Sequence, residues 1–145
     1  MTVNIRRLKA SDRSAWEPLW QAYLAFYGVD LAPEVCDVTW RRLVLEKGAM
    51  FALGAYDADR LVGFAHCLFH PATWAIADRL YLEDLFVASD ARGLGAGRAL
   101  MDAVFAEAEA QNADKVYWQT EASNRRARAL YDQVGTLTAY VRYER

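Results

Sequence analysis

The chain has few cysteines and no long apolar run. Its two cysteines, Cys36 and Cys67, belong to no CxxC pair. They cannot form a disulfide framework and do not indicate a structural zinc site, and a reducing cytoplasmic compartment is expected. No apolar stretch approaches the roughly 18 to 20 residues that a membrane span needs. The first residues also lack an apolar signal core, so the sequence predicts neither membrane insertion nor secretion.

The chain also lacks an excess of positive charge. It carries 17 Lys and Arg against 19 Asp and Glu, a formal net charge of -2, so no general basic field would attract nucleic acid. His66 and His70 are four residues apart, but they fall in a segment typical of a strand, and we expect no metal site there. With 145 residues, 54% of them hydrophobic, residues 1–145 are expected to form one domain.

Hydrophobic periodicity predicts an alternation of strands and helices without internal repeats. A helix capped by Ser11 or Asp12 should end near Gly28, and a second one should start after Pro33 and end near Gly48. Strands are expected at residues 3–8, 50–56, 61–69, 80–87, 116–119 and 137–143. Further helices are expected at residues 100–110 and from about 124 to Gly135. The outcome is an α/β fold, a mixed sheet with helices on both faces.

A glycine-rich segment, Arg-Gly-Leu-Gly-Ala-Gly, occupies residues 92–97 between a predicted strand and a predicted helix. Glycines let the backbone approach a phosphate, and the first helical N–H groups are free to bind it. Arg92 adds a fixed positive charge. The spacing matches neither G-x-G-x-x-G nor a Walker A loop. The segment indicates a diphosphate site, and the alternative is a turn that binds nothing.

A second segment, residues 121–135, is typical of a capped helix. Ser123 or Asn124 is a suitable N-cap, and Gly135 is a natural end of the helix. Apolar residues at helical spacing place Tyr131 on the buried stripe. Spacing alone favours a core role for this tyrosine.

Two carboxylates interrupt the apolar strand of residues 81–87. Strand alternation predicts that Glu83 lies on one face, while Leu82, Asp84 and Phe86 lie on the other. A buried carboxylate is costly unless it is paired, hydrogen-bonded or protonated, so at least one of the two should face a cleft. In the alternative interpretation, both lie at a solvent-exposed strand edge.

These three segments together resemble the GNAT family of N-acetyltransferases. Arg92, Gly95 and Gly97 match the Q/R-x-x-G-x-G/A loop that binds pyrophosphate in that family. The second segment matches at Asn124, Ala127, Leu130, Tyr131 and Gly135. Within the family, the strand Tyr-Leu-Glu-Asp-Leu-Phe-Val is most similar to the polyamine and thialysine acetyltransferases and to the histone/polyamine acetyltransferase subgroup.

The resemblance implies a GNAT fold: a mixed, mostly antiparallel sheet of six to seven strands with about four helices. Strands four and five, residues 80–87 and 116–119, would splay apart around acetyl-coenzyme A. The implied coenzyme contacts are Phe86, Val87, Arg92, Gly93, Leu94, Gly95, Ala96, Gly97, Arg98, Asn124 and Tyr131. Arg125, Arg126 and Arg128 are interpreted as a solvated helix face, with phosphate contact as the alternative.

The resemblance also implies catalytic roles. Glu83 would accept the proton of an amine, directly or through water, and Tyr131 would protonate the departing thiolate. No cysteine is placed for a covalent acyl intermediate. The residues assigned to the acceptor are Tyr27, Trp74, Glu83, Asp84 and Trp118; further candidates are Tyr23, Trp40, Asp30 and Glu34.

The expected activity is acetyl transfer to a primary amine of a small amine, amino acid or polyamine. Protein lysine acetylation and a non-catalytic acyl-coenzyme A sensor are the alternatives. Relatives suggest a homodimer, to which the terminal segment of residues 140–143 is suited. No metal, nucleic-acid or membrane partner is expected.

Overall fold

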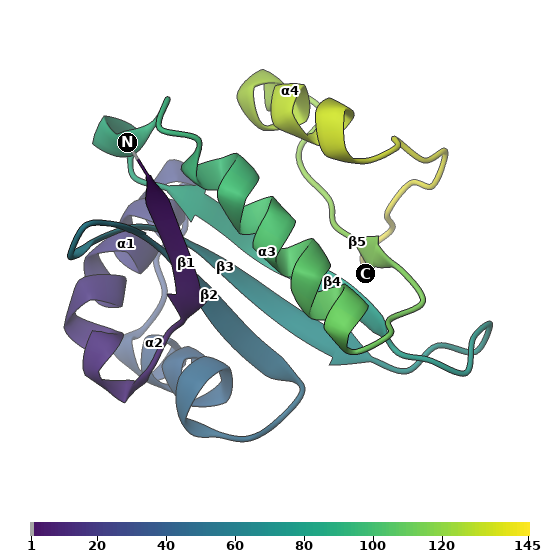
Figure 1. Ribbon diagram of the computed structural model, residues 1–145, viewed down its shortest axis with the longest axis horizontal. Helices are drawn as coiled ribbons and strands as arrows, with labels where there is room; N and C mark the ends of the chain where they lie inside the picture. The colour runs from purple at the N-terminus through teal and green to yellow at the C-terminus, as the bar shows by residue number, and fades with distance from the viewer. Residues whose placement is uncertain (1) are drawn as a thin grey trace.

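The computed structural model describes residues 2–145 and contains a five-stranded sheet in the order β1-β2-β3-β4-β5 (Figure 1). The first four strands pair antiparallel, and β5 runs parallel to β4. The strands are β1 (Val3–Arg7), β2 (Met50–Asp57), β3 (Arg60–His70), β4 (Arg79–Val87) and β5 (Val116–Tyr117). The predicted α/β GNAT fold is confirmed, with fewer strands than the six to seven expected.

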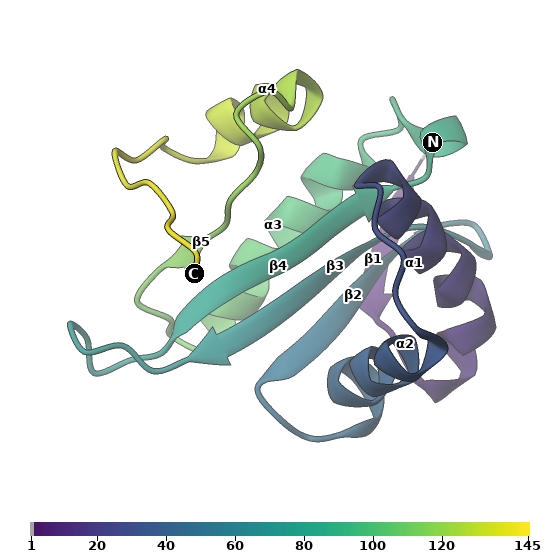
Figure 2. The ribbon, with the colours of Figure 1, turned by 180° about the vertical axis from the view of Figure 1, so that it is seen from behind.

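Helices cover both faces of this sheet. Figure 2 shows α1 and α2 over the near face and α3 over the far face, with α4 beside α3. The helices are α1 (Arg13–Phe26), α2 (Pro33–Trp40), α3 (Ala96–Ala110) and α4 (Arg125–Val134), with short 3-10 turns η1 (Ala10–Asp12) and η3 (Ser89–Ala91) and a π-helical turn η2 (Arg41–Leu45). Within residues 2–145, none of the helices combines the length and apolar character that crossing a bilayer requires.

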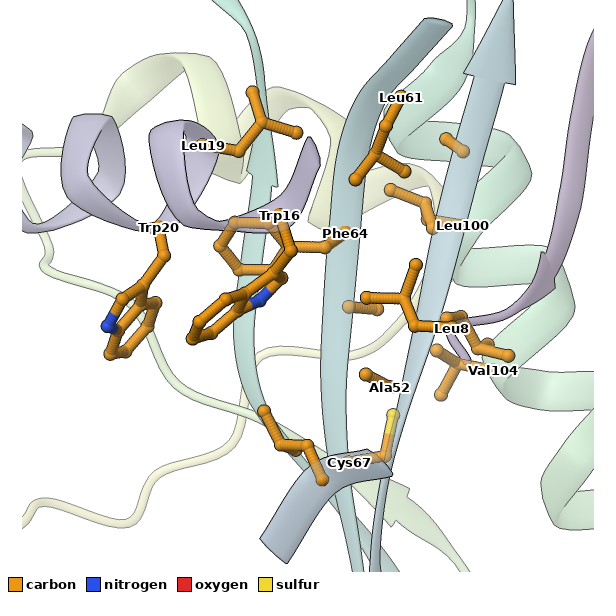
Figure 3. Close-up of a cluster of buried hydrophobic side chains, with 14 of the residues drawn as sticks. Leu8, Trp16, Leu19, Trp20, Ala52, Leu61, Phe64, Cys67, Leu100 and Val104 are labelled. Carbon is orange, nitrogen blue, oxygen red and sulfur yellow. The ribbon is translucent and has the colours of Figure 1, made fainter. Parts of the chain in front are cut away.

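Two hydrophobic layers hold the helices to the sheet. Helix α1 buries an aromatic and aliphatic stripe against β3, and Trp16 and Phe64 are fully buried there. On the other side of the strands, α3 buries Leu100 and Val104 (Figure 3). Burying side chains of this size stabilises a fold by about 1.5–3 kcal/mol each, so the two layers fix where β4 and the start of α3 lie.

The predicted last strand, residues 137–143, is absent from the sheet. Strand β5 pairs with β4 at only two residues. Residues 137–143 therefore have almost no strand at this edge of the sheet with which to pair. Leu137, Tyr140 and Tyr143 are each at least three-quarters exposed. An alternating apolar pattern indicates a strand only where a partner strand is available, and that partner is missing here.

A β-bulge in β4 overturns the predicted alternation of its side chains. His66 lies opposite Asp84, but the next residue of β3, Cys67, lies opposite Leu82, so Glu83 has no residue opposite it. Residues opposite each other in a ladder share a face. Leu82 therefore shares the face of Cys67, whereas Asp84 shares the opposite face with His66. The prediction that Leu82 and Asp84 lie together is wrong, because an extra residue shifts the two-residue period.

Candidate active site

A cleft of about 850 Å³ lies between β4, the start of α3 and helix α4, with α1 closing one end. It exists because the β4–β5 ladder stops after Leu80 and Tyr81. The rest of β4, through Val87, has no strand on that side among residues 2–145. Phe86 and Val87, both predicted coenzyme contacts, line the cleft.

The glycine-rich turn forms one wall of the cleft. Gly93 and Gly95 have φ of +89° and +79°, a backbone conformation that favours glycine. Gly95 is the N-cap of α3, so the N–H groups of Ala96, Gly97 and Arg98 have no acceptor in an earlier turn of the helix. The cleft is lined by Gly93, Gly95, Ala96, Gly97 and Arg98, whereas Leu94 does not line it. Unpaired amides at a helix N-terminus favour a bound anion.

Arginines surround the same wall. Arg92 and Arg98 come from the turn and the start of α3, and Arg125 and Arg126 come from the first turn of α4; all four border the cleft. The positions of Arg125 and Arg126 therefore suit contact with a phosphate, which was the alternative to their interpretation as part of a solvated helix face. Arg128 points elsewhere and donates to the carbonyl of Ala122 at 2.8 Å.

Helix α4 brings Asn124 and Tyr131 to the cleft. The Asn124 side chain caps the helix by accepting a hydrogen bond from the Ala127 N–H at 3.2 Å. Tyr131 packs its ring on Trp118, with centroids 5.5 Å apart, and burial raises the pKa of Tyr131 to about 12. The phenol therefore keeps its proton at neutral pH and can donate it.

The α1 end of the cleft is aromatic. Tyr23 meets the rings of Tyr27 and Phe86 edge-on, at centroid distances of 5.1 and 5.8 Å. Burial raises the pKa of Tyr27, and the nearby Glu121 carboxylate adds to the effect. Glu121 lines the cleft as well. Sequence reasoning missed Glu121, and its position just before the capped helix was the only available signal.

Of the two acids of β4, Asp84 contacts this aromatic end, and Glu83 precedes it in the strand. Burial raises the pKa of Glu83, and the charge of Asp84 raises it further. Asp84 accepts a hydrogen bond from the Tyr23 hydroxyl at 2.7 Å and lies 2.9 Å from His66 Nδ1. Neither carboxylate lines the cleft itself; Asp84 is connected to it through Tyr23.

The structure does not bring every predicted acceptor residue to the cleft. Trp74 lies on the β3–β4 connection and is 83% exposed, and it does not line the cleft. Trp118 packs between Phe105 and Tyr131 instead. Of the five residues assigned to the acceptor, Tyr27 alone lines the cleft directly. The further candidate Trp40 is buried against Trp16.

The histidines and cysteines form no metal centre in the part of the chain that the structure describes. No group of three or more His, Cys, Asp or Glu side chains gathers within residues 2–145. His66 is buried among aromatic rings, and His70 is hydrogen-bonded to the Tyr117 hydroxyl at 2.6 Å. Cys36 and Cys67 are both free and buried.

Several known proteins similar to this chain are described as acetyltransferases. The sequence model described as "Acetyltransferase (GNAT) family" matches residues 11–136. A D-amino-acid N-acetyltransferase of Saccharomyces cerevisiae, HPA3, is 33% identical over 145 residues, covering 99% of this chain and 90% of the yeast protein. The uncharacterized N-acetyltransferase YhfO of Bacillus subtilis is 36% identical over 136 residues, covering 92% and 89%.

Solved structures of other proteins share the fold of this chain. A ribosomal-protein-alanine N-acetyltransferase from Brucella melitensis biovar Abortus 2308 has a TM-score of 0.84 and 26% identity, covering 99% of this chain and 98% of that one. AAC(6')-Iy, solved with a bisubstrate analog of coenzyme A, has a TM-score of 0.85 at 15% identity, covering 100% and 98%, and shows the shared fold alone. The match over most of the chain establishes that this protein belongs to the GNAT family of N-acetyltransferases.

Proposed function

We propose that this acetyltransferase moves an acetyl group from acetyl-coenzyme A directly to a primary amine of an amino acid, a small amine or a polyamine. One observation carries the proposal: a single cleft joins the glycine-rich turn to Tyr131 and to an aromatic end, where Glu121 lines the wall and Asp84 is hydrogen-bonded to Tyr23. The yeast relative, named as a D-amino-acid N-acetyltransferase, makes amino acids the first acceptors to test.

The donor is assigned to the glycine end of the cleft. The N–H groups of Gly93, Gly95 and Gly97, together with the Arg92 guanidinium, would hold the pyrophosphate. A Cβ added at Gly93 or Gly95 would meet no atom within 4 Å, so the backbone there is open to an approaching ligand. The free main-chain groups of Phe86 and Val87 would bind the pantetheine arm in the manner of an added strand.

The proton transfers are assigned to two side chains. An amine is mostly protonated at neutral pH and must lose a proton before it attacks the thioester carbon. Glu83 would accept this proton, directly or through water, and its raised pKa makes it a better acceptor than an ordinary carboxylate. As the carbon–sulfur bond breaks, Tyr131 would donate its proton to the departing sulfur. Asp84 adds negative charge for the cationic amine.

Direct transfer is favoured over a covalent acyl-enzyme. Cys36 and Cys67 are buried, and burial raises the pKa of the Cys67 thiol, so the nucleophilic thiolate is disfavoured. Neither cysteine lines the cleft. A random or ordered ternary-complex pattern, rather than ping-pong kinetics, is the expected steady-state behaviour.

The test is a thiol-release assay with acetyl-coenzyme A and a panel of D- and L-amino acids, diamines, spermidine, a histone-tail peptide and a peptide with N-terminal alanine. The proposal expects turnover on a small amine, with mass spectrometry placing the acetyl group on nitrogen. Turnover only on the peptides would replace it with a protein acetyltransferase. Coenzyme binding without turnover on any acceptor would support a sensor.

Four broader expectations accompany this proposal. We assign residues 1–145 to one acetyltransferase domain, place the protein in the cytoplasm and group it with the polyamine, thialysine and histone/polyamine acetyltransferases. We also expect a homodimer, in which the exposed tail with Tyr140 and Tyr143 would be covered. A solution mass equal to one chain at all concentrations tested would contradict the dimer.

A further inference from the structure

A continuous chain of side-chain hydrogen bonds, buried at its Trp16 end and part-buried at its Tyr23 end, connects the core to the cleft. It starts at Trp16 on α1, whose Nε1 lies 3.0 Å from Nε2 of His66 on β3. His66 Nδ1 lies 2.9 Å from Oδ2 of Asp84 on β4. Oδ1 of Asp84 lies 2.7 Å from the hydroxyl of Tyr23, which is back on α1 and lines the cleft.

The direction of each hydrogen bond in this chain is fixed by its first member. An indole N–H can only donate, so His66 Nε2 carries a lone pair and the ring proton is on Nδ1. Nδ1–H then donates to one oxygen of Asp84. A carboxylate only accepts, so the second oxygen receives the hydroxyl proton of Tyr23. The rings of Trp16 and Trp20 lie side by side on α1, with Trp16 over β3 (Figure 3).

The hydroxyl of Tyr23 has one proton, which it donates to Asp84. Its oxygen therefore presents only lone pairs to the cleft, where it can accept a hydrogen bond and cannot give one. We propose that Trp16 and His66 are positioning residues that hold the Tyr23 oxygen as an acceptor for an N–H of the incoming amine. This inference rests on the proposed function, because it assigns part of the amine site.

The surroundings of the network support a specific role. The Trp16 and His66 side chains are at most 1% exposed, so water does not compete with their hydrogen bonds. Burial and the Asp84 charge both raise the pKa of Tyr23, which keeps its proton on oxygen. Tyr131, the proposed donor to sulfur, lines the same cleft as Tyr23, so the amine would be held beside the reacting atoms.

The chain offers a matched control in Trp20. This indole is also buried on α1 and stacks on both Trp16 and Tyr23, but its Nε1 has no hydrogen-bond partner among residues 2–145. Trp16→Phe and Trp20→Phe remove the same ring from neighbouring positions in the core. Only the first removes a member of the hydrogen-bond chain.

The experiment compares Michaelis constants of the full-length variants, at a temperature where each remains folded. In Trp16→Phe and Tyr23→Phe, the KM for the best amine should rise about tenfold, the scale of one hydrogen bond, while the KM for acetyl-coenzyme A stays unchanged. Trp20→Phe should leave both constants near wild type. Equal amine constants in Trp16→Phe and Trp20→Phe would overturn the proposal, as would a wild-type amine constant in Tyr23→Phe.

Nitrogen NMR provides a readout that does not depend on turnover. The chain has only two histidines, so ring nitrogens in a ¹⁵N-labelled sample give two sets of signals. His66 should show a protonated Nδ1 and an unprotonated Nε2. Trp16→Phe removes the N–H donor to Nε2 and should shift the Nε2 signal, whereas Trp20→Phe should leave that signal in place. A protonated Nε2 in the wild type would overturn the inference even if the enzyme acetylates amines. Absence of amine turnover with the predicted tautomer present would instead contradict the proposed function.

Discussion

The two ends of the cleft are built in different ways. The end proposed to bind the donor, here called the donor end, consists of main-chain N–H groups and glycines from one short stretch, with Arg92, Gly93, Gly95 and Gly97 within six residues of one another. The end proposed to bind the amine, here called the acceptor end, consists of side chains from three elements that are distant in sequence: Tyr23 on α1, His66 on β3 and Asp84 on β4.

This difference separates what each end can recognise. A main-chain site recognises the phosphates shared by every coenzyme A ester and leaves little room for variation in sequence. A side-chain site can change with each substitution, so it is the place where acceptor preference is set. If the two ends act independently, a substitution at one end should leave binding at the other end unchanged.

The largest expected effect comes from Glu83→Gln. Removing the proposed proton acceptor should lower kcat by about 100-fold, the lower range for general base catalysis, and should leave acetyl-coenzyme A binding unchanged. Steady-state kinetics measures kcat, and a titration with acetyl-coenzyme A measures its binding. Glu46→Gln, at an exposed position at the end of η2, is the control and should behave as wild type. A Glu83→Gln enzyme with normal kcat would remove Glu83 from the mechanism.

Gly95→Val should damage the donor end. The positive φ of Gly95 is costly for a β-branched residue, by about 1–3 kcal/mol of folding free energy. Relaxation of the turn should also raise the KM for acetyl-coenzyme A more than the KM for the amine. Thermal unfolding and kinetics measure both effects. Gly48→Val, where an added Cβ meets no atom within 4 Å and φ is not positive, should change neither.

Arg92→Ala should weaken the donor end without affecting the fold. Loss of one charged hydrogen-bond donor to a phosphate should raise the Kd for acetyl-coenzyme A about tenfold. Titrations in low and high salt test whether the effect is electrostatic, because screening by salt should reduce the difference in Kd between the variant and the wild type. Arg41→Ala, at an exposed site on η2, is the comparison. A variant that binds the coenzyme as tightly as wild type would show that Arg92 does not contact it.

The smallest effect concerns pH. Glu83 acts as a base only when ionised, and burial, followed by the charge of Asp84, raises its pKa above 4.5. The acidic limb of kcat should therefore lie above the ordinary range for glutamate. Asp84→Asn removes the neighbouring negative charge, which lowers the pKa of Glu83 and moves the limb to lower pH. The Arg142 charge acts on the pKa of Glu83 in the opposite sense and remains in place. A limb that moves to higher pH would contradict this assignment.

The contrast between adjacent residues at the donor end and distant residues at the acceptor end also explains which features the sequence predicts. The order of elements and the glycine turn follow from local patterns, because a strand, a turn and a helix N-terminus occupy adjacent residues. The β-bulge at Glu83 has no local signature: it depends on how β4 pairs with β3. The missing strand at residues 137–143 has a similar cause, since its alternating pattern does not reveal that β5 is too short to pair with it.

The acceptor end could be anticipated only in part. Tyr23 and Asp84 were each candidate cleft residues, but nothing in the spacing joins them to each other or to His66 and Trp16. Their contacts span up to 61 positions in the sequence. Aromatic rings suit an amine, which makes Trp74 and Trp118 candidates from the sequence; the fold leaves Trp74 in solvent and packs Trp118 against Tyr131. Residue type indicates chemistry, but only the fold decides which side chains meet.

The most direct test of the account is a crossed measurement of Michaelis constants for Arg92→Ala and Tyr23→Phe. With a preferred amine identified, the account predicts that Arg92→Ala raises the KM for acetyl-coenzyme A alone and that Tyr23→Phe raises the KM for the amine alone. If both variants raise the same constant, or if the wild-type protein transfers no acetyl group to any amine, the assignment of donor and acceptor to opposite ends of the cleft is contradicted.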